Sequence, residues 1–596
     1  MITLVNRLRS TFWPRTGQPT AEANDQREDV LVKNQDRTLL GPESPVALQL
    51  DRLQGDIEKI RELCKVSSIC YAVFHRGHFL DGSVGLCDRE NSRSPDRHTL
   101  YTLCSISKTF VAACIGILVE ERKVEWTDTL EKLLPEYLPP GDDKRVSTEA
   151  TLNDFFRHSS GLGNPVVTWL GPKGKVLVAE KGFIELLNDT PVGPFRSHWE
   201  YSNIGIGMMA LIVQKVSGQR FADFLRERIL RPLGMDDTAV SKSDVLESCN
   251  TAHPYVQLGD AKWVKVEHEW TSEDHTPILG MIGIRSSVKD LTIWGIATMA
   301  AQKYTPFESS RQEIEVPFSK SPIQNPLRQM RAILDDWYWT RPHEDPHQNT
   351  SQYHLSWMKV EMPSMMTHWG SYNSKLADNA ELRDQSYIDQ HILGQHSPRQ
   401  KLIKSVGLGY CCANTLQLYP DSGSVIVVLS NGLNLGDAAD FTASILSQDI
   451  FKLTPSVDIL GMAKDECGER LRIYEKMMAK WEQHRDVSEP ESSLDDYIGD
   501  YRLLGLTLSV RRSPKLRTLE LCFNNREEIV QSLEYYNKDK YSYMPRSRDE
   551  WLRGAWLDWD YYLVGILDFV RDAKNQVTGV KWMYNDWTPA VFFKRA

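Results

Sequence analysis

The sequence predicts an α+β protein in which strands lie at both ends of a mainly helical middle, followed by a separate antiparallel β unit. Residues 68–74 and 78–80 read as two strands of a hairpin around Arg76 and Gly77. Residues 401–430 contain three more strand-like runs, and from Leu494 onward short alternating runs rich in aromatic residues appear. A chain of 596 residues is longer than one hydrophobic core supports, so several structural units are expected.

The composition excludes several classes of protein. The chain is 41% hydrophobic and 25% charged, as in ordinary globular proteins. A formal net charge of −10 without a long basic run argues against a protein that binds nucleic acid by neutralising phosphates. The longest apolar runs, such as residues 110–119, are far shorter than the roughly 20 residues that cross a bilayer, so no membrane span is expected.

The N-terminus and the cysteines predict an intracellular setting. Residues 1–16 are basic and lack the continuous apolar core of a secretory signal, so a cytoplasmic location is expected. The ten cysteines show neither paired nor even spacing, which predicts reduced thiols rather than a zinc ribbon or a disulfide framework.

Hydrophobic periodicity divides the first part of the chain. Residues 1–45 are polar and are predicted to be a leader. Apolar positions from 48 to 64 recur at helical spacing. Residues 107–122 are almost wholly apolar after Lys108 and have helical length, which predicts a buried helix. These elements open a catalytic domain expected to span residues 46–455.

The second half of the chain changes character three times. Residues 306–400 are rich in Pro, His, Gln and Trp, which predicts a lid or a substrate-facing insert. A helix is expected at about 437–451, and a charged helical linker over 456–490. Residues 491–596 combine short strands, turn residues and many aromatic side chains, which predicts an antiparallel β-barrel domain.

Ser105 and Lys108 form an S-x-x-K pattern at the start of the apolar helix. A separation of three residues puts both side chains on one helical face, where a lysine among apolar neighbours can help to accept the serine proton. Taken alone, the serine also suits a helix N-cap. Ser286 and Lys289 repeat the pattern, but they lie in a polar stretch without an apolar helix behind them.

Tyr201 and Asn203 form a Y-x-N pattern before the apolar run 204–213. A tyrosine near a lysine can act as a general base toward a serine hydroxyl, and the asparagine could bond the lysine or a substrate amide. The pattern by itself is common, and Tyr535 with Asn537 is a second instance.

The order of these motifs resembles the serine β-lactamase and penicillin-binding protein superfamily, nearest the class C type and its esterase and transacylase relatives. Three further stretches resemble the family in the expected order: 151–162, 231–238 and 280–291. The resemblance covers roughly residues 50–455. It implies an antiparallel sheet flanked by helices, with a helical half inserted between its strands. The C-terminal segment resembles the lipocalin-like domain attached to many such hydrolases.

The resemblance assigns residues to the catalytic roles. It implies that Ser105 is the nucleophile, that Lys108 and Tyr201 manage its proton, and that Asn203 positions the substrate. Because this places Ser105 among five ordered matching segments, the nucleophile interpretation replaces the N-cap one. His158 belongs to one of these stretches and is expected to support the fold.

The chain departs from the family at its third motif, which usually carries Lys or His. The alignment without gaps puts Ser405 at that position and Gly407 at the following glycine. Lys404 should point to the opposite strand face. The Leu408 N–H and that of Ser105 are expected to form an oxyanion hole. The alternative is the literal H-x-G of His368, Trp369 and Gly370, which lacks the strand context and is expected in the lid.

The sequence therefore predicts a serine hydrolase that forms an acyl-enzyme on a small-molecule substrate. The neutral Ser405 and the aromatic insert favour an ester, lactone or thioester of a secondary metabolite. An acyltransferase using the same site is the first alternative, and a non-catalytic binding scaffold with the same fold is the second. No cofactor is implied, and the dispersed histidines match no metal-binding spacing, so no metal site is predicted. The oligomeric state is left open.

Overall fold

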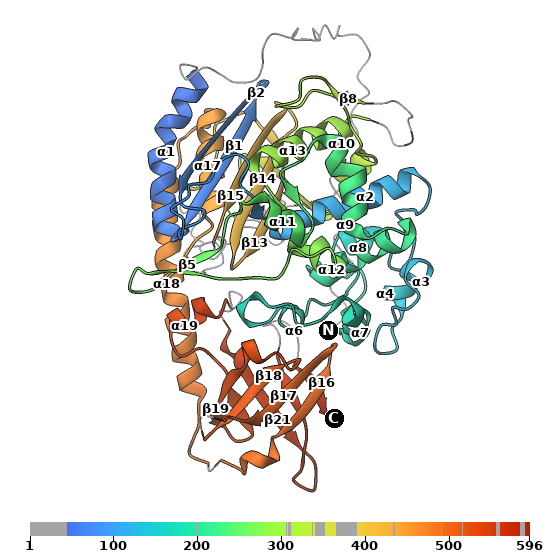
Figure 1. The fold of residues 1–596 in the computed structure, drawn as a ribbon, viewed down its shortest axis with the longest axis vertical. Coiled ribbons are helices and arrows are strands. Elements are labelled where there is room, and N and C mark those ends of the chain that lie inside the picture. Colours follow the sequence, from blue (N-terminus) through green and yellow to red (C-terminus); the bar gives the residue numbers. More distant parts are fainter. Residues whose placement is uncertain are drawn as a thin grey trace, which may run out of the picture. The chain divides into compact units, whose positions relative to one another are not determined.

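The fold is taken from a computed structural model of the chain (Figure 1). It describes residues 45–197, 199–304, 307, 312–335, 338–339, 352–364, 390–432, 435–489, 491–514, 517–555, 561–583 and 590–596. Two of the predictions made above, the leader and the lid residues His368 and Trp369, lie outside the described residues.

An antiparallel sheet of eight strands forms the centre of the part of the chain that precedes residue 456, in the order β10-β11-β12-β13-β14-β15-β1-β2. Pairing of β1 with β15, in which Ile69 lies opposite Ser430, joins strands from the two ends of this part of the chain. The strands are β1 (Ser68–His75), β2 (His78–Gly85), β10 (Tyr338–Trp339), β11 (Gln352–His354), β12 (Trp357–Met362), β13 (Gln400–Gly409), β14 (Cys412–Tyr419) and β15 (Ser424–Ser430).

Helices cover both faces of this sheet, so its central strands are apolar on both sides. Every residue of β15 is buried. Val427 and Leu429 belong to one hydrophobic cluster while Ile426 and Val428 belong to the other, because successive side chains of a strand point to opposite faces. Helices α1 (Pro45–Cys64) and α17 (Ala438–Ile450) pack on one face and α13 (Val288–Gln302) on the other (Figure 1).

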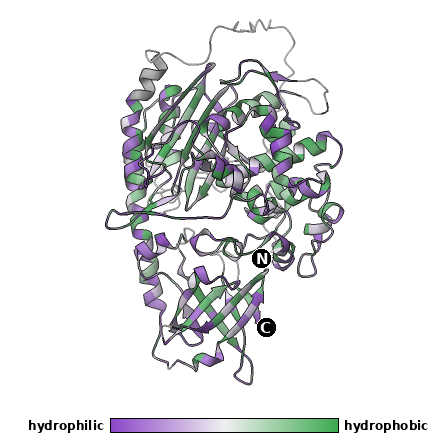
Figure 2. Cartoon of the chain, in the orientation of Figure 1, coloured by the Kyte–Doolittle hydropathy of each residue, from purple (hydrophilic) through white to green (hydrophobic). Residues whose placement is uncertain are grey.

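A mainly helical region lies between β2 and β10 in the chain. Its two longest helices before α13 are α2 (Ser107–Glu120) and α8 (Asn203–Ser217). Phe110 of α2 stacks on Trp294 of α13 with ring centroids 4.2 Å apart, which connects this region to the sheet. The sheet strands and α2 are mostly hydrophobic in Figure 2, as elements buried on several sides require.

The helix predicted over residues 107–122 is α2, and the three strands predicted within 401–430 are β13, β14 and β15. Part of the predicted insert, residues 352–362, adds β11 and β12 to the edge of the sheet next to β13. The lid role of the rest stays a prediction. Among the described residues, no helix combines the length and hydrophobicity needed to cross a membrane.

Helix α18 (Ile459–His484) leads to a closed antiparallel barrel of eight strands. The barrel interior is filled by aromatic side chains such as Tyr501, Tyr541 and Trp582, which are at most 1% exposed. Trp481 of α18 donates a hydrogen bond to Ser542 Oγ, which joins the helix to the barrel. The strands are β16 (Gly499–Leu503), β17 (Leu506–Arg512), β18 (Leu519–Phe523), β19 (Gln531–Asn537), β20 (Lys540–Ser542), β21 (Ile566–Arg571), β22 (Val577–Trp582) and β23 (Val591–Arg595).

Candidate active site

Ser105 lies in a short 3₁₀ turn, η1 (Cys104–Ile106), that runs directly into α2. Its side chain is half-buried, whereas Lys108, one turn later, is only 1% exposed. The Lys108 Nζ donates hydrogen bonds to Ser105 Oγ over 2.8 Å and to the Met281 carbonyl over 2.9 Å. The three-residue separation thus brings the two side chains together as the helical spacing predicts.

Tyr201 reaches the same oxygen from a different part of the chain. Its hydroxyl donates to Ser105 Oγ over 3.0 Å, and the Lys108 Nζ lies 5.2 Å from the centre of its ring. Both partners are therefore within hydrogen-bond reach of the proton that Ser105 must lose before it attacks a carbonyl. The arrangement supplies a nucleophile with two candidate proton acceptors.

Tyr201 is held in place by the start of α8 and by His158. Ser202 caps the helix, because its Oγ accepts a hydrogen bond from the Gly205 amide, and its own amide donates to His158 Nδ1 over 3.1 Å. The His158 ring lies 4.4 Å from that of Tyr201. Since Nδ1 accepts a hydrogen bond, the neutral ring carries its proton on Nε2, which faces the Tyr353 hydroxyl at 3.2 Å.

His158 contacts the site, although the sequence predicted only that it supports the fold. Burial, with the nearby Lys108 charge, holds the pKa of its imidazole well below the usual value, so it stays neutral beside Tyr201. Its contacts join Tyr201 through Tyr353 to β11, the second strand from one edge of the sheet. The only signal in the sequence is its place in the 151–162 stretch, which does not reveal that the ring packs on Tyr201.

Asn203 lies in the first turn of α8 and is hydrogen-bonded to Asn164. The Asn203 backbone amide and its side-chain Nδ2 donate to Asn164 Oδ1 over 3.0 and 3.3 Å. Within the described part of the chain, Lys108 is bonded to Ser105 and Met281 and not to Asn203. Of the two expected partners of Asn203, the lysine is thus excluded here, and the substrate amide stays a prediction.

Strand β13 passes beside the turn that carries Ser105. The Cys104 thiol donates to the Leu408 carbonyl over 2.8 Å, so the residue before Ser105 is bonded to the strand that carries the third motif. Gly407 lies against Leu103, where a Cβ atom would come within 1.9 Å of the carbonyl oxygen. The glycine permits this close approach, which sets the expected oxyanion donors, the amides of Ser105 and Leu408, on adjoining segments.

Ser405 is buried on β13, and its hydroxyl donates to the Ser356 carbonyl over 3.4 Å. Its neighbour Lys404 faces the opposite side, where the carboxylates of Asp437 and Asp440 oppose the lowering of its pKa by burial. This matches the expected alternation along the strand. Lys404 therefore does not supply the missing positive charge on the Ser405 side. The alternative third-motif residues, His368 and Trp369, fall outside the described residues.

The chain is similar in sequence to several curated proteins, among them a penicillin-binding protein, a hydrolase and an esterase. It is 29% identical over 164 residues to penicillin-binding protein 4* of Bacillus subtilis (strain 168), covering 26% of this chain and 34% of that protein. It is 27% identical over 175 residues to the unguisins hydrolase ungD' of Aspergillus campestris (strain IBT 28561), covering 28% and 31%. It is 26% identical over 214 residues to esterase EstB of Burkholderia gladioli, covering 32% and 53%. The chain thus spans between about a third and about half of the length of these relatives.

The fold also resembles a solved structure over most of its length. An octameric penicillin-binding protein homologue from Pyrococcus abyssi superposes with a TM-score of 0.51 at 16% identity, covering 89% of this chain and 97% of that one. The family model described as Beta-lactamase matches residues 55–448, more than half of the chain. This match shows that the chain belongs to the beta-lactamase family.

Proposed function

We propose that the protein is a serine hydrolase that forms an acyl-enzyme on Ser105. The observation that carries this proposal is the convergence of two donors, Lys108 Nζ at 2.8 Å and Tyr201 OH at 3.0 Å, on the Ser105 oxygen. Two proton-managing groups on one hydroxyl are what nucleophilic catalysis by serine requires. A purely structural serine would be satisfied by either one.

The reaction proceeds in two stages. Ser105 Oγ attacks the acyl carbonyl carbon and forms a C–O bond, while the carbonyl π electrons move onto the carbonyl oxygen. The serine proton passes to Tyr201 as the phenolate or to Lys108 as the neutral amine. The amides of Ser105 and Leu408 bind the oxyanion that develops on the carbonyl oxygen. The tetrahedral intermediate then expels the alcohol or thiol, which takes up the proton. Water attacks the acyl-enzyme with the same groups as general base and releases the acid.

The proposed substrate is an uncharged ester, lactone or thioester of a secondary metabolite. Ser405, at the position where relatives carry Lys or His, adds no charge to its side of β13, and Lys404 faces away toward Asp437 and Asp440. A substrate carboxylate would therefore find no cationic partner at this position. The name of one relative, an esterase, agrees with an ester substrate.

A fluorophosphonate probe tests the nucleophile directly. Intact mass of the wild type should show one adduct, and peptide mass should locate it on Ser105. Ser105→Ala should lose both the adduct and the turnover of p-nitrophenyl butyrate. Ser286→Ala is the matched control, because Ser286 stands in the second S-x-x-K pattern yet bonds Thr238, and it should still be labelled. Full turnover by Ser105→Ala would overturn the proposal and assign the chemistry to another site, whereas a wild type with neither adduct nor turnover would favour the non-catalytic scaffold.

Product analysis distinguishes hydrolysis from acyl transfer, because both reactions pass through the same acyl-enzyme. With p-nitrophenyl butyrate and increasing concentrations of a primary alcohol, a hydrolase yields butyrate throughout, whereas a transferase yields butyryl ester in proportion to the alcohol. The comparison uses the same acyl-enzyme, so it does not depend on the natural substrate.

A further inference from the structure

A cavity of about 440 Å³ opens in the same part of the chain as Ser105, with other residues lining it. It is bordered by the loop from Asp88 to Arg93, the end of α11 (Lys242–Ser248), β6 (Trp263–Lys265) and β7 (Arg285–Ser286). Neither Ser105, Lys108 nor Tyr201 lines it. Its volume is in the range of small-molecule sites.

Arg285 is one of the cationic residues that line this cavity. Its Nε donates to Thr271 Oγ1 over 3.2 Å, and its Nη2 lies 3.5 Å from His268 Nε2. No carboxylate forms an ion pair with Arg285 among the residues that the structure describes. Burial lowers the pKa of its guanidinium, because a charge removed from water without a counter-ion is destabilised.

His268 lines the same cavity, and one of its ring nitrogens is buried without a hydrogen-bond partner among the described residues. Its Nε2 faces the Arg285 guanidinium, which can only donate, and the Thr102 hydroxyl at 3.0 Å, so Nε2 accepts and the proton resides on Nδ1. Within the described ranges, this Nδ1 is buried and has no hydrogen-bond partner. Burial together with the charges of Arg285 and His253 holds the pKa of His268 well below its usual value.

Thr251 supplies a third polar group in the lining of the cavity. Thr251 is 6% exposed, and its Oγ1 is buried without a hydrogen-bond partner in the described part of the chain. Buried polar atoms are nearly always bonded, so two unbonded ones on residues that line the same cavity as a guanidinium without a counter-ion indicate a missing acceptor. Each of the three groups can donate a hydrogen bond.

The acidic residues of the cavity do not neutralise these donors. Asp88 lies 3.9 Å from Arg93 and accepts hydrogen bonds from Asn91. Glu267 is exposed to solvent, as is the cationic Lys265. The interior part, around Arg285, is therefore cationic.

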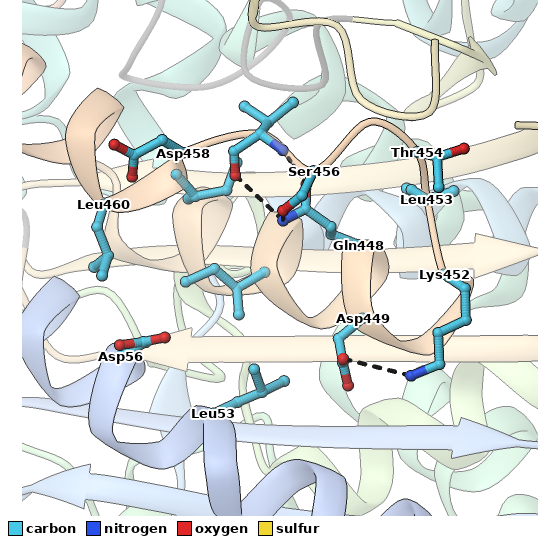
Figure 3. Close-up of a pocket in the computed structure, with 13 residues that line it drawn as sticks. Leu53, Asp56, Gln448, Asp449, Lys452, Leu453, Thr454, Ser456, Asp458 and Leu460 are labelled. Carbon is cyan, nitrogen blue, oxygen red and sulfur yellow. Dashed lines mark hydrogen bonds and ion pairs between the residues drawn. The ribbon is translucent and has the colours of Figure 1, made fainter. Parts of the chain in front are cut away.

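A larger cavity is drawn in Figure 3, but among the described residues it is not lined by a comparable group of unbonded donors. It measures about 620 Å³ and lies between α1, α17 and the segment before α18. Its polar groups bond to one another: Gln448 to Ser456 and Val457, and Asp449 to Lys452 (Figure 3). We therefore draw nothing from it.

We propose that the cavity around Arg285 binds the oxyanion group, carboxylate or phosphate, of a small molecule, with Arg285 as the charged anchor and His268 Nδ1 and Thr251 Oγ1 as hydrogen-bond donors. A guanidinium binds two oxygens of either group in a fork. The site is independent of the chemistry proposed for Ser105, so either can fail without the other.

Isothermal titration calorimetry of the full chain tests the site, with sodium glutarate and sodium phosphate as separate probes at constant ionic strength set by chloride. The wild type should bind at least one probe saturably at one site per chain, and the tighter probe tells whether the group is a carboxylate or a phosphate. Arg285→Gln should weaken that binding about ten-fold or more, because a hydrogen bond to a charged group is lost. Arg399→Gln, at an exposed arginine elsewhere, should bind as the wild type does.

Thr251→Val gives a second measurement that does not remove a charge. It keeps the size of the side chain, deletes the unbonded hydroxyl and should weaken binding several-fold. Thermal unfolding of each variant shows whether it is folded. If Arg285→Gln is not folded, the Thr251→Val result decides. No saturable heat with either probe, or wild-type affinity in the folded variants, would overturn the proposal.

Discussion

Gly407 of β13 lies so close to Leu103 that a Cβ atom on the glycine would stand 1.9 Å from the Leu103 carbonyl oxygen. The neighbouring Cys104 is bonded to Leu408 in the same place. The contact therefore joins the segment before Ser105 to the strand that carries the Leu408 amide. No side chain at position 407 is compatible with this spacing, because the obstructing atom belongs to the backbone and cannot rotate away.

Gly407→Ala should consequently separate the two segments. We expect a loss of stability of about 1–3 kcal/mol, the usual cost of overpacking, and a larger loss of kcat because the oxyanion donors move apart. Denaturant unfolding and p-nitrophenyl butyrate kinetics measure the two effects. Gly468→Ala is the control, since that α18 glycine has open space around its Cβ position and should gain about 0.5–1 kcal/mol. Wild-type kcat in Gly407→Ala would contradict the oxyanion assignment.

Tyr201→Phe removes only the hydroxyl that bonds Ser105. If this oxygen takes the serine proton, kcat should fall by about 10²–10⁴-fold while the fold is kept. The matched control is Tyr535→Phe, in the second Y-x-N pattern, whose hydroxyl bonds Glu489 in the barrel part of the chain. Its kcat should not change. An unchanged kcat in Tyr201→Phe would leave Lys108 as the sole base.

Ser405→Lys should alter substrate preference. The wild type should hydrolyse uncharged short-chain esters well above nitrocefin and benzylpenicillin, because a carboxylate loses its hydration without a charged partner at this position. A hydrogen bond to a charged group contributes roughly 1.5–3 kcal/mol, so the lysine should shift the kcat/KM ratio toward the carboxylate substrates by about one to two decades. Ser405→Ala, which removes the hydroxyl without adding charge, should not shift it. Equal wild-type hydrolysis of nitrocefin and a neutral ester would refute the alignment and favour His368.

Asp290 should make stability depend on pH. Burial at the start of α13 raises the pKa of its carboxyl to about 7, although Lys289 partly opposes the shift. A carboxyl whose pKa is higher in the folded than in the unfolded protein stabilises the fold at low pH, and this contribution is lost as pH rises from about 4 to 7. Asp290→Asn cannot ionise, so its free energy of unfolding relative to wild type should rise across that interval by up to about 4 kcal/mol. Denaturant unfolding at several pH values measures the difference. A constant difference would show that the carboxyl is ionised throughout.

Local patterns predicted the elements that depend on local chemistry. The helix expected over 107–122 ends at Glu120. The second of the three strands expected within 401–430 begins at Cys412, because Tyr410 and Cys411 form the turn between β13 and β14. Such offsets are small because hydrophobic periodicity reports which face is buried, whereas the residue that ends an element depends on its partner strand. The aromatic content of the last part likewise predicted a barrel, whose interior those rings fill.

The sequence by itself determined the pairing of Ser105 with Lys108, since three residues of helix fix that distance, and the alternation that turns Lys404 away from Ser405. The tertiary structure decided which residues from distant segments meet. It brought Tyr201 to the serine, His158 to the tyrosine, and Arg285 to His268 in the lining of the 440 Å³ cavity. The physical reason is that spacing along a helix or strand follows from backbone geometry, whereas contacts between segments depend on how the sheet and helices pack, which no local pattern encodes.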